Sequence, residues 1–291
     1  MDGIVVGADQ TGAGVAAARW ALEAGALRGV PVTVVRAWAD PIALGYGMGM
    51  TLMTELETFR RAAEDTARDV LRKAGGPSGG PAPSAVALEG RPAEVLTEAS
   101  RTADLVVVGT RSAGALSRGV LGSVSAAVLH HAHCPVVVVP EPHDEPAAPR
   151  RVVVGVDHSP GSVHALGWAA EEAERRRWPL VPVLVREPAG IGSGRSGEQV
   201  DLTRLEASER AALVAAARTH HPSVTVEPEV LSGHAAHALL DFVHLGDLLV
   251  LGARGRGGFR SLLLGSTSTA VAQHARCPVV VLRPPHPTDA R

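Results

Sequence analysis

Few cysteines, a single lysine and the lack of long apolar runs exclude several classes of protein for this chain of 291 residues. The two cysteines, Cys134 and Cys277, each precede a Pro-Val-Val run, where a small apolar side chain packs well. We therefore expect neither a disulfide nor a cysteine-bound metal. Lys73 is the one lysine and no G-x4-G-K-[ST] motif occurs, which excludes a P-loop phosphate site.

No segment has the character of a membrane span or of a secretion signal. Apolar runs stay well below the ~20 residues that cross a bilayer, and no basic region followed by a signal-like stretch opens the chain. The formal net charge of −2 gives no bulk attraction to nucleic acid or to a membrane surface. We therefore expect a cytoplasmic protein that binds neither.

One long sequence pattern occurs twice. Residues 5–9, Val-Val-Gly-Ala-Asp, return as Val-Val-Gly-Val-Asp at 153–157, an offset of 148 residues. Cys-Pro-Val-Val-Val at 134–138 returns at 277–281, an offset of 143 residues. A repeat of this length indicates a duplicated domain rather than a solenoid unit. Residues 141–150, rich in proline and charge, are typical of a linker, so we expect domains at 1–140 and 151–291.

Each half alternates short β-branched runs with longer amphipathic stretches. In the first half we expect strands near 3–8, 32–38, 84–88, 104–109 and 135–139, with helices near 12–29, 52–74, 92–102 and 122–132. In the second half we expect strands near 152–156, 180–186, 223–230, 247–251 and 278–283. This alternation predicts an α/β fold, two tandem doubly wound parallel sheets with helices on both faces.

A glycine-rich loop follows the fourth predicted strand of each half. In the second half Gly252, Gly255 and Gly265 precede Ser266 with the spacing G-x2-G-x9-G-S, and the first half keeps that spacing with Ser112 in place of the middle glycine. Ligands of parallel sheets lie beyond the carboxyl ends of the strands, where glycines and a helix N-terminus can hold a phosphate. The alternative is a pair of ordinary turns, which two copies with matched spacing disfavour.

Aspartates and arginines near these loops are candidate ligand contacts. Asp9 and Asp157 end the first strand of each half and could accept hydrogen bonds from ribose hydroxyls, although helix-capping aspartates are the alternative. The arginines in or near the loops could contact phosphate or simply be solvated; they are Arg111, Arg118, Arg254, Arg256 and Arg260.

Other apparent motifs lack the context that their chemistry requires. Residues 192–197 match G-x-G-x-x-G and residues 76–80 match G-x-S-x-G, but neither opens a compact strand-turn-helix unit, so both are expected to be loops. Three histidines lie at 130, 131 and 133, but the second half has Gln273, His274 and Arg276 at the matching positions, which disfavours a metal site. His158, beside Asp157, is expected to be exposed.

These patterns together resemble the ATP-binding branch of the universal stress protein family in a tandem two-domain form. The Val-Gly-x-Asp opening, the G-x2-G-x9-G-S loop and the closing Cys-Pro-Val-Val-Val run carry the resemblance over nearly the whole chain. It implies an adenine nucleotide alpha hydrolase-like fold, with five parallel strands per half in the order 3-2-1-4-5. It also implies ATP, with Mg²⁺ as a candidate counter-ion, bound between strands one and four.

The resemblance assigns roles to matching positions. In the second half Asp157 would hold the ribose, the Val185 backbone the adenine, and the loop the phosphates through Gly252, Arg254, Gly255, Gly265, Ser266 and Thr267. The matching first-half positions are Asp9, Ala37, Gly109, Arg111, Ser112, Gly122, Ser123 and Val124. If the position of Ser112 requires a positive φ, a non-glycine there costs about 1 kcal/mol, which predicts a weaker first site.

Three functions remain as hypotheses. The first is a stress-response regulator whose conformation, assembly or partner choice depends on ATP. The second is a slow ATPase or a phosphoryl or nucleotidyl transferase, which the sequence disfavours because no paired carboxylates or metal cluster accompany the loops. The third is a nucleotide-free scaffold.

The closing strands at 136–139 and 279–282 are expected at sheet edges, where they would pair within one chain and leave other surfaces for a homodimer.

Overall fold

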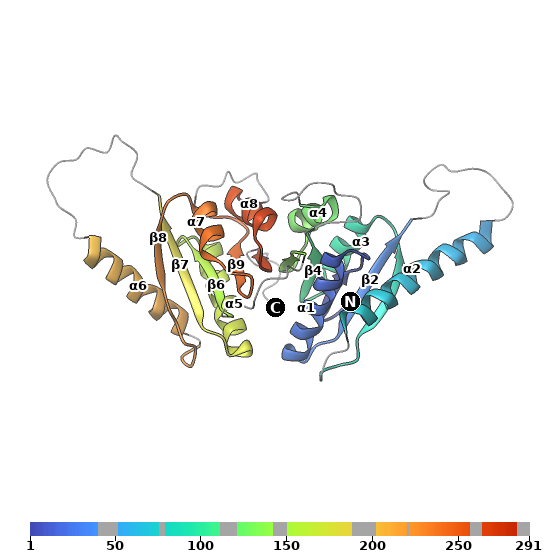
Figure 1. The fold of residues 1–291 in the computed structure, drawn as a ribbon, viewed down its shortest axis with the longest axis horizontal. Helices are drawn as coiled ribbons and strands as arrows, with labels where there is room; N and C mark the ends of the chain where they lie inside the picture. Colours follow the sequence, from blue (N-terminus) through green and yellow to red (C-terminus); the bar gives the residue numbers. More distant parts are fainter. Residues whose placement is uncertain are drawn as a thin grey trace. The chain divides into compact units, whose positions relative to one another are not determined.

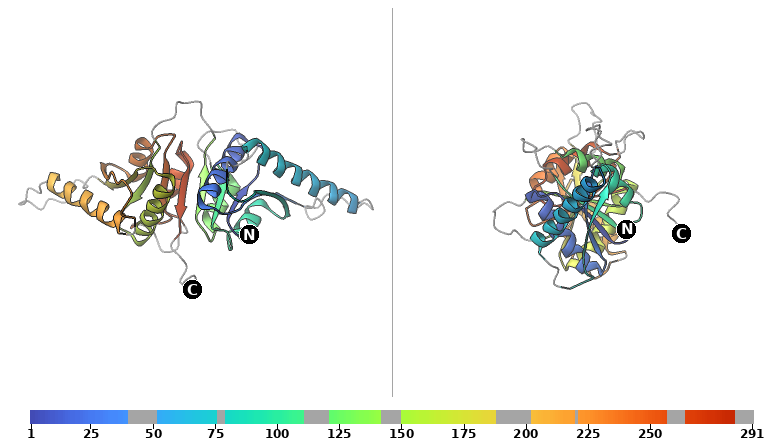
Figure 2. Two further views of the ribbon diagram at one scale, coloured as in Figure 1. Left: turned by 90° about the horizontal axis from the view of Figure 1, so that it is seen from below. Right: turned by 90° about the vertical axis from the view of Figure 1, so that its right-hand side faces the viewer.

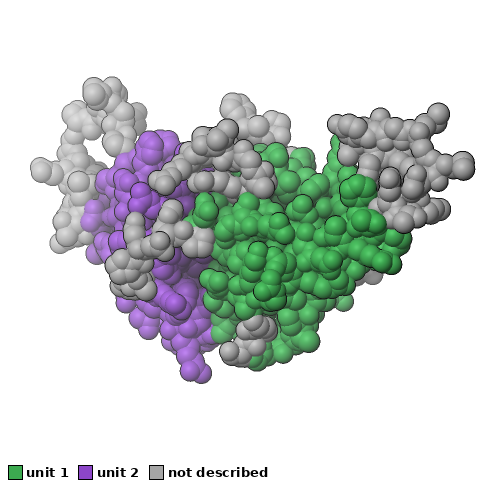
Figure 3. All heavy atoms as spheres, turned by 45° about the vertical axis from the view of Figure 1, so that its right-hand side comes forward, with its two compact units in different colours: residues 1–144 green, residues 145–291 purple. Residues whose placement is uncertain are grey.

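The computed structural model describes residues 1–39, 52–75, 79–110, 121–141, 150–187, 202–219, 221–256 and 264–283. The chain divides into two compact units, Met1–Asp144 and Glu145–Arg291, which are coloured separately in Figure 3. No helix within those described ranges is long and apolar enough to cross a membrane.

Unit 1 is an α/β domain built on a parallel sheet (Figure 1). Its strands lie in the order β3-β2-β1-β4-β5, which is the predicted order 3-2-1-4-5. The elements in chain order are β1 (Ile4–Gly7), α1 (Gly12–Arg28), β2 (Val32–Trp38), α2 (Leu52–Ala74), β3 (Ser84–Glu89), α3 (Pro92–Ala99), β4 (Leu105–Gly109), α4 (Ser123–His131) and β5 (Val136–Val139).

Unit 2 repeats this architecture. Its strands lie in the order β10-β9-β6-β7-β8, all parallel, with the first strand of the unit between its second and fourth as in unit 1. The elements are β6 (Val152–Val156), α5 (Pro160–Arg176), β7 (Leu180–Arg186), α6 (Leu202–Arg218), β8 (Glu229–Ser232), α7 (Ala235–Phe242), β9 (Leu248–Gly252), α8 (Ser266–His274) and β10 (Val279–Leu282).

Helices on both faces explain why the strands are continuous apolar runs rather than alternating ones (Figure 2). Helix α1 packs against α2 and helix α3 against α4, with the sheet between the two pairs, and α5 to α8 follow the same pattern. The valines and leucines of β4 and β9 are at most 5% exposed, apart from the glycine that ends each strand. The core of each unit is therefore its central strands.

Side-chain caps set the first turn of the helix that follows each leading strand. Thr11 accepts a hydrogen bond from the Gly14 N–H at the start of α1, and Ser159 accepts one from the Ser162 N–H at the start of α5. These caps satisfy donors that a helix N-terminus leaves unpaired. They also place the loop between strand and helix, which carries Asp9 or Asp157, at the carboxyl edge of the sheet.

The third strand of unit 2 differs from the prediction. A strand was expected near 223–230, but β8 is Glu229–Ser232, preceded by an isolated bridge between Leu180 and Val226. Pro228 has no N–H to donate to a ladder, and its carbonyl accepts a hydrogen bond from Arg210 instead. The regular strand therefore begins only after this proline.

Candidate functional site

Unit 2 contains a cavity of about 810 Å³ at the carboxyl ends of β6, β7 and β9. This volume is within the usual range of ligand pockets, roughly 300–1,000 Å³. Every residue predicted for the second-half site lines the cavity: Asp157, Val185, Gly252, Arg254, Gly255, Gly265, Ser266 and Thr267. The structure therefore brings together residues from four separate segments that the sequence pattern had linked.

The Asp157 carboxylate links the end of β6 to the glycine-rich loop. Oδ1 accepts a hydrogen bond of 3.0 Å from the Ser159 N–H, and Oδ2 accepts one of 2.8 Å from the Arg256 N–H. Burial acts to raise the pKa of Asp157, but hydrogen bonds from Ser159, Arg256 and Ser162 outweigh it and hold the pKa below the ordinary 3.8. An ionised carboxylate only accepts hydrogen bonds and has about four acceptor sites, which suits a ligand that donates hydroxyl groups.

Gly255 is a glycine because of this carboxylate, not because of its backbone angle. A Cβ at Gly255 would lie 2.4 Å from Asp157 Oδ2, which is far inside van der Waals contact. Its φ is not positive, so the matching position of unit 2 does not meet the condition of a left-handed backbone that was stated for Ser112. A larger residue here must move away from the aspartate, or the aspartate must turn.

The other glycines of the two loops have different local environments. A Cβ at Gly252 would lie 2.9 Å from the backbone carbonyl atoms of Gly161, and one at Gly109 would lie 2.9 Å from the backbone of Ala13. These glycines let the first helix of each unit, α5 or α1, pack closely on the end of the fourth strand. At Gly265 the atom nearest to such a Cβ is 3.5 Å away, so the residues that the structure describes give no steric reason for a glycine there.

The N-terminus of α8 faces the cavity with free polar groups. No side chain caps this helix in the part of unit 2 that the structure describes. Ser268 and Thr269 donate to the Gly265 carbonyl, whereas the hydroxyls of Ser266 and Thr267 have no partner among those residues. Free N–H groups, free hydroxyls and the positive end of the helix dipole favour an anion.

Positively charged side chains also line the cavity. Arg254 and Arg256 both line it. Burial lowers the pKa of the nearby Arg283, and the charge of Arg254 lowers it further. Cationic side chains therefore gather where the sequence analysis expected phosphate, although Arg260 lies outside the described residues.

Several cavity residues were not found from the sequence. Ser162 accepts a hydrogen bond from the Asp157 N–H at 3.2 Å, and the apolar wall includes Leu184, Leu239 and Leu264. Leu184 and Leu239 belong to strand and helix patterns that predict core in general, and no local signal marked Leu264 in the loop before α8. His158, which was expected to be exposed, is exposed and has a φ of 61°, in the left-handed region.

The first-half site is described only in part. Asp9 follows β1, Ala37 lies in β2, Gly109 ends β4, and Gly122, Ser123 and Val124 lie at the start of α4. Asp9 accepts hydrogen bonds from the N–H and the hydroxyl of Thr11. Three loop residues lie outside the described residues, as do residues 76–78 and 192–197 of the rejected motifs; the loop residues are Arg111, Ser112 and Arg118.

Comparison with known proteins agrees with this architecture. The model of the universal stress protein family matches residues 1–140 and 149–283. A universal stress protein of Mycolicibacterium smegmatis is 37% identical over 291 residues, covering 97% of each chain. One of Mycobacterium tuberculosis is 34% identical over 297 residues, covering 97% of this chain and 96% of that protein.

A solved structure shares the fold over the same extent. The crystal structure of a universal stress protein from Archaeoglobus fulgidus DSM 4304 has a TM-score of 0.64 at 20% identity, covering 97% of this chain and 98% of that one. The resemblance inferred from the sequence is thus confirmed at the level of family and fold. The chain belongs to the universal stress protein family and carries two tandem copies of the family's domain.

Proposed function

We propose that this protein is a nucleotide-dependent stress-response regulator that binds an adenine nucleotide, principally ATP, in the cavity of unit 2. The observation that carries the proposal is the cavity itself, because it combines an apolar wall, an ionised aspartate and an uncapped helix N-terminus. Those three features match the base, the ribose and the phosphates of one ligand. Unit 1 has the same strand order and matching residues, and we propose a weaker site there.

Each part of the nucleotide has a candidate contact. The backbone of Val185, at the end of β7, would bind the adenine edge, and the Asp157 carboxylate would accept hydrogen bonds from ribose hydroxyls. The phosphates would lie against the α8 N-terminus, Ser266 and the loop arginines. Mg²⁺ would be carried by the phosphates, since Mg²⁺ commonly binds through phosphate oxygens and water.

Binding is a better fit than turnover. A general base for hydrolysis works best with a pKa near the operating pH, whereas the pKa of Asp157 is held below its ordinary value. Both oxygens of Asp157 also accept hydrogen bonds from the protein backbone. We therefore propose that occupancy, rather than hydrolysis, is the signal, and that it biases the conformation or partner choice of a cytoplasmic protein.

Native mass spectrometry of the full chain as purified tests the proposal. Co-purifying adenine nucleotide, or a mass shift on addition of ATP, is the expected result, and the ratio of ATP to ADP bears on turnover. Calorimetry with ATP in the presence of Mg²⁺ and of a chelator then shows whether the metal contributes. A chain that takes up no adenine nucleotide under either condition would support the scaffold function instead.

A further inference from the structure

The two units carry different residues at a position beside the place where the adenine of the nucleotide would bind. In unit 1 Gly7 pairs with Val35, and in unit 2 Gly155 pairs with Val183. The next residue along each second strand is Arg36 in unit 1 and Leu184 in unit 2. These two side chains therefore occupy equivalent places in the two sheets, although one is a cation and the other is apolar.

Leu184 forms part of the cavity wall in unit 2. It is 7% exposed and lines the cavity together with Val156, which it pairs with across β6 and β7. A wall of this kind suits a neutral aromatic base, because apolar contact with the ring replaces water at no cost in hydrogen bonds.

Arg36 places a guanidinium at the matching point of unit 1. Its Nη1 donates a hydrogen bond of 3.0 Å to the Ala8 carbonyl, directly after β1. Ala8 is 7% exposed and occupies the position of Val156, one of the residues that line the unit 2 cavity. The guanidinium therefore lies across the end of β1, where unit 2 leaves room for a ligand.

An adenine base that enters unit 1 would meet the hydrogen bond between Arg36 and the Ala8 carbonyl. If it displaces the guanidinium, a charge-assisted hydrogen bond is lost and a buried carbonyl is left unpaired. If it does not, the base meets a half-buried cation in place of an apolar wall. The exocyclic amino group of adenine is itself a donor, which leaves only the ring nitrogens of the base as acceptors for the guanidinium.

We propose that this position determines which unit binds the adenine nucleotide more tightly: Leu184 admits the base in unit 2, and Arg36 disfavours it in unit 1. This inference rests on the proposed function, since it concerns the same kind of site. Its consequence is that the intact chain holds one adenine nucleotide tightly.

Reciprocal substitutions test the inference in the full chain, with ATP affinity and stoichiometry measured by calorimetry. Leu184→Arg should bind ATP at least about tenfold more weakly than the matched control Leu184→Met, a difference of ~1.4 kcal/mol. Arg36→Leu should gain a second tight site, whereas Arg36→Lys, which keeps the charge, should not. Circular dichroism and thermal denaturation identify any variant that fails to fold.

Three outcomes separate this inference from the proposed function. Equal affinity of Leu184→Arg and Leu184→Met would overturn it, and that comparison does not depend on the stability of any unit 1 variant. Weaker total binding by Arg36→Leu would also overturn it, since it would show that the guanidinium holds a ligand in unit 1. A wild-type chain and a Leu184→Met variant that both fail to bind ATP would refute the proposed function itself.

Discussion

A single added methyl group should have different effects at two positions of the same loop. At Gly265 a Cβ meets nothing closer than 3.5 Å, so Gly265→Ala should fold normally and yet weaken ATP binding, because the methyl group would lie where a phosphate approaches the backbone. At Gly252 the Cβ would lie 2.9 Å from the Gly161 backbone, so Gly252→Ala should cost stability, about 1–3 kcal/mol. Thermal denaturation and calorimetry on both variants separate the two effects.

The matched change in unit 1 is Gly122→Ala. We expect it to reduce total ATP binding less than Gly265→Ala, because the unit 1 site is the weaker one. Equal losses from the two changes would contradict the asymmetry between units, and no loss from either would contradict the assignment of the loops to phosphate.

Asp157 should contribute to ATP and ADP binding equally. If it holds ribose hydroxyls, Asp157→Ala removes hydrogen bonds to a charged group, each of which contributes roughly 1.5–3 kcal/mol, and the lost contact is remote from the γ-phosphate. Calorimetry with both nucleotides measures the change. Selective loss of ATP would instead place the carboxylate near the terminal phosphate or a metal, and would favour an enzyme.

The same aspartate predicts a pH dependence of stability. Its folded pKa is lowered from 3.8, so the stability it contributes is present above the unfolded pKa and is lost as the pH falls through the folded value. The stability of the wild type relative to Asp157→Asn should therefore decrease below about pH 4. Thermal denaturation from pH 2 to pH 6 measures this difference, and a constant difference over that range would contradict the assignment.

At the scale of elements, one buried ion pair joins the starts of two neighbouring strands in unit 2. Arg151, just before β6, donates to both carboxylate oxygens of Asp247, just before β9, at 3.0 Å and 2.6 Å. The Asp247 side chain is 0% exposed and also accepts a hydrogen bond from the His244 N–H. Arg151 stacks over Phe242 at 4.9 Å, which ties the end of α7 into the same cluster.

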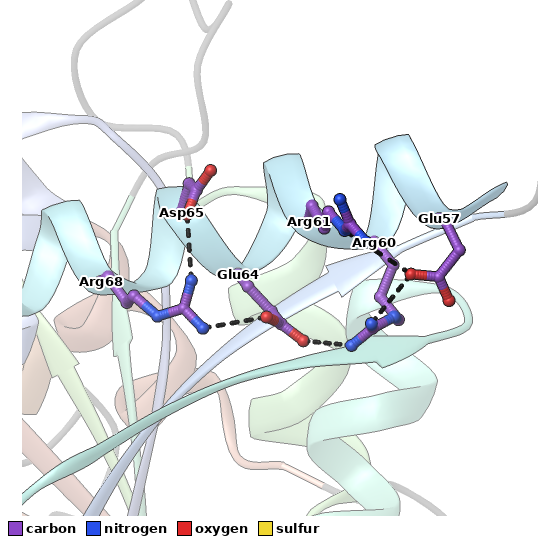
Figure 4. A network of polar contacts seen from close by, with 6 residues as sticks. All are labelled: Glu57, Arg60, Arg61, Glu64, Asp65 and Arg68. Atoms are coloured by element: carbon purple, nitrogen blue, oxygen red, sulfur yellow. Dashed lines mark hydrogen bonds and ion pairs between the residues drawn. The ribbon is translucent and has the colours of Figure 1, made fainter. Parts of the chain in front are cut away.

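Removing one partner of this pair leaves a buried charge without compensation. Arg151→Ala should therefore lower the free energy of unfolding by about 3–5 kcal/mol, as measured by chemical denaturation. The matched control is Arg61→Ala on α2, where the partner Glu57 is exposed and part of the ladder of ion pairs in Figure 4. That change should have no measurable effect, since exposed pairs contribute little. Similar losses from both variants would contradict the argument.

The strands other than β8, and the tandem repeat, could be predicted because apolar runs, their spacing and the repeat are visible in the sequence itself. That the candidate residues of unit 2 lie together could also be predicted, because parallel strands bring their carboxyl ends to one edge. The reason for Gly255 could not, since it depends on a carboxylate nearly one hundred residues earlier in the chain. Leu184 and Arg36 likewise have a meaning only once their strands are placed beside β6 and β1.

The closing strand of each unit is an apolar strand that could pair with the edge of another sheet. β5 and β10 follow β4 and β9 in the strand orders of their own units, and each is an unbroken apolar run. Such an edge invites pairing with another edge. The sequence predicts that the two edges of one chain pair with each other and that any homodimer uses other surfaces.

Val138→Lys together with Val281→Lys tests this prediction, because a charged side chain on each strand opposes edge pairing. We expect an increased radius of gyration by small-angle scattering, or loss of the folded state. Unchanged compactness with unchanged thermal stability would show that the units do not meet through these strands.

The two cysteines supply a way to observe each unit separately. Burial raises the pKa of both the Cys134 and the Cys277 thiol to about 12, and one thiol belongs to each unit. Only the thiolate reacts with alkylating reagents, so modification of the fully buried Cys277 at neutral pH should follow opening of unit 2. A ligand that binds the native form of unit 2 alone should slow alkylation of Cys277 and leave that of Cys134 unchanged. Peptide masses of the alkylated wild-type chain thus report which half of the molecule a nucleotide protects, without any introduced cysteine.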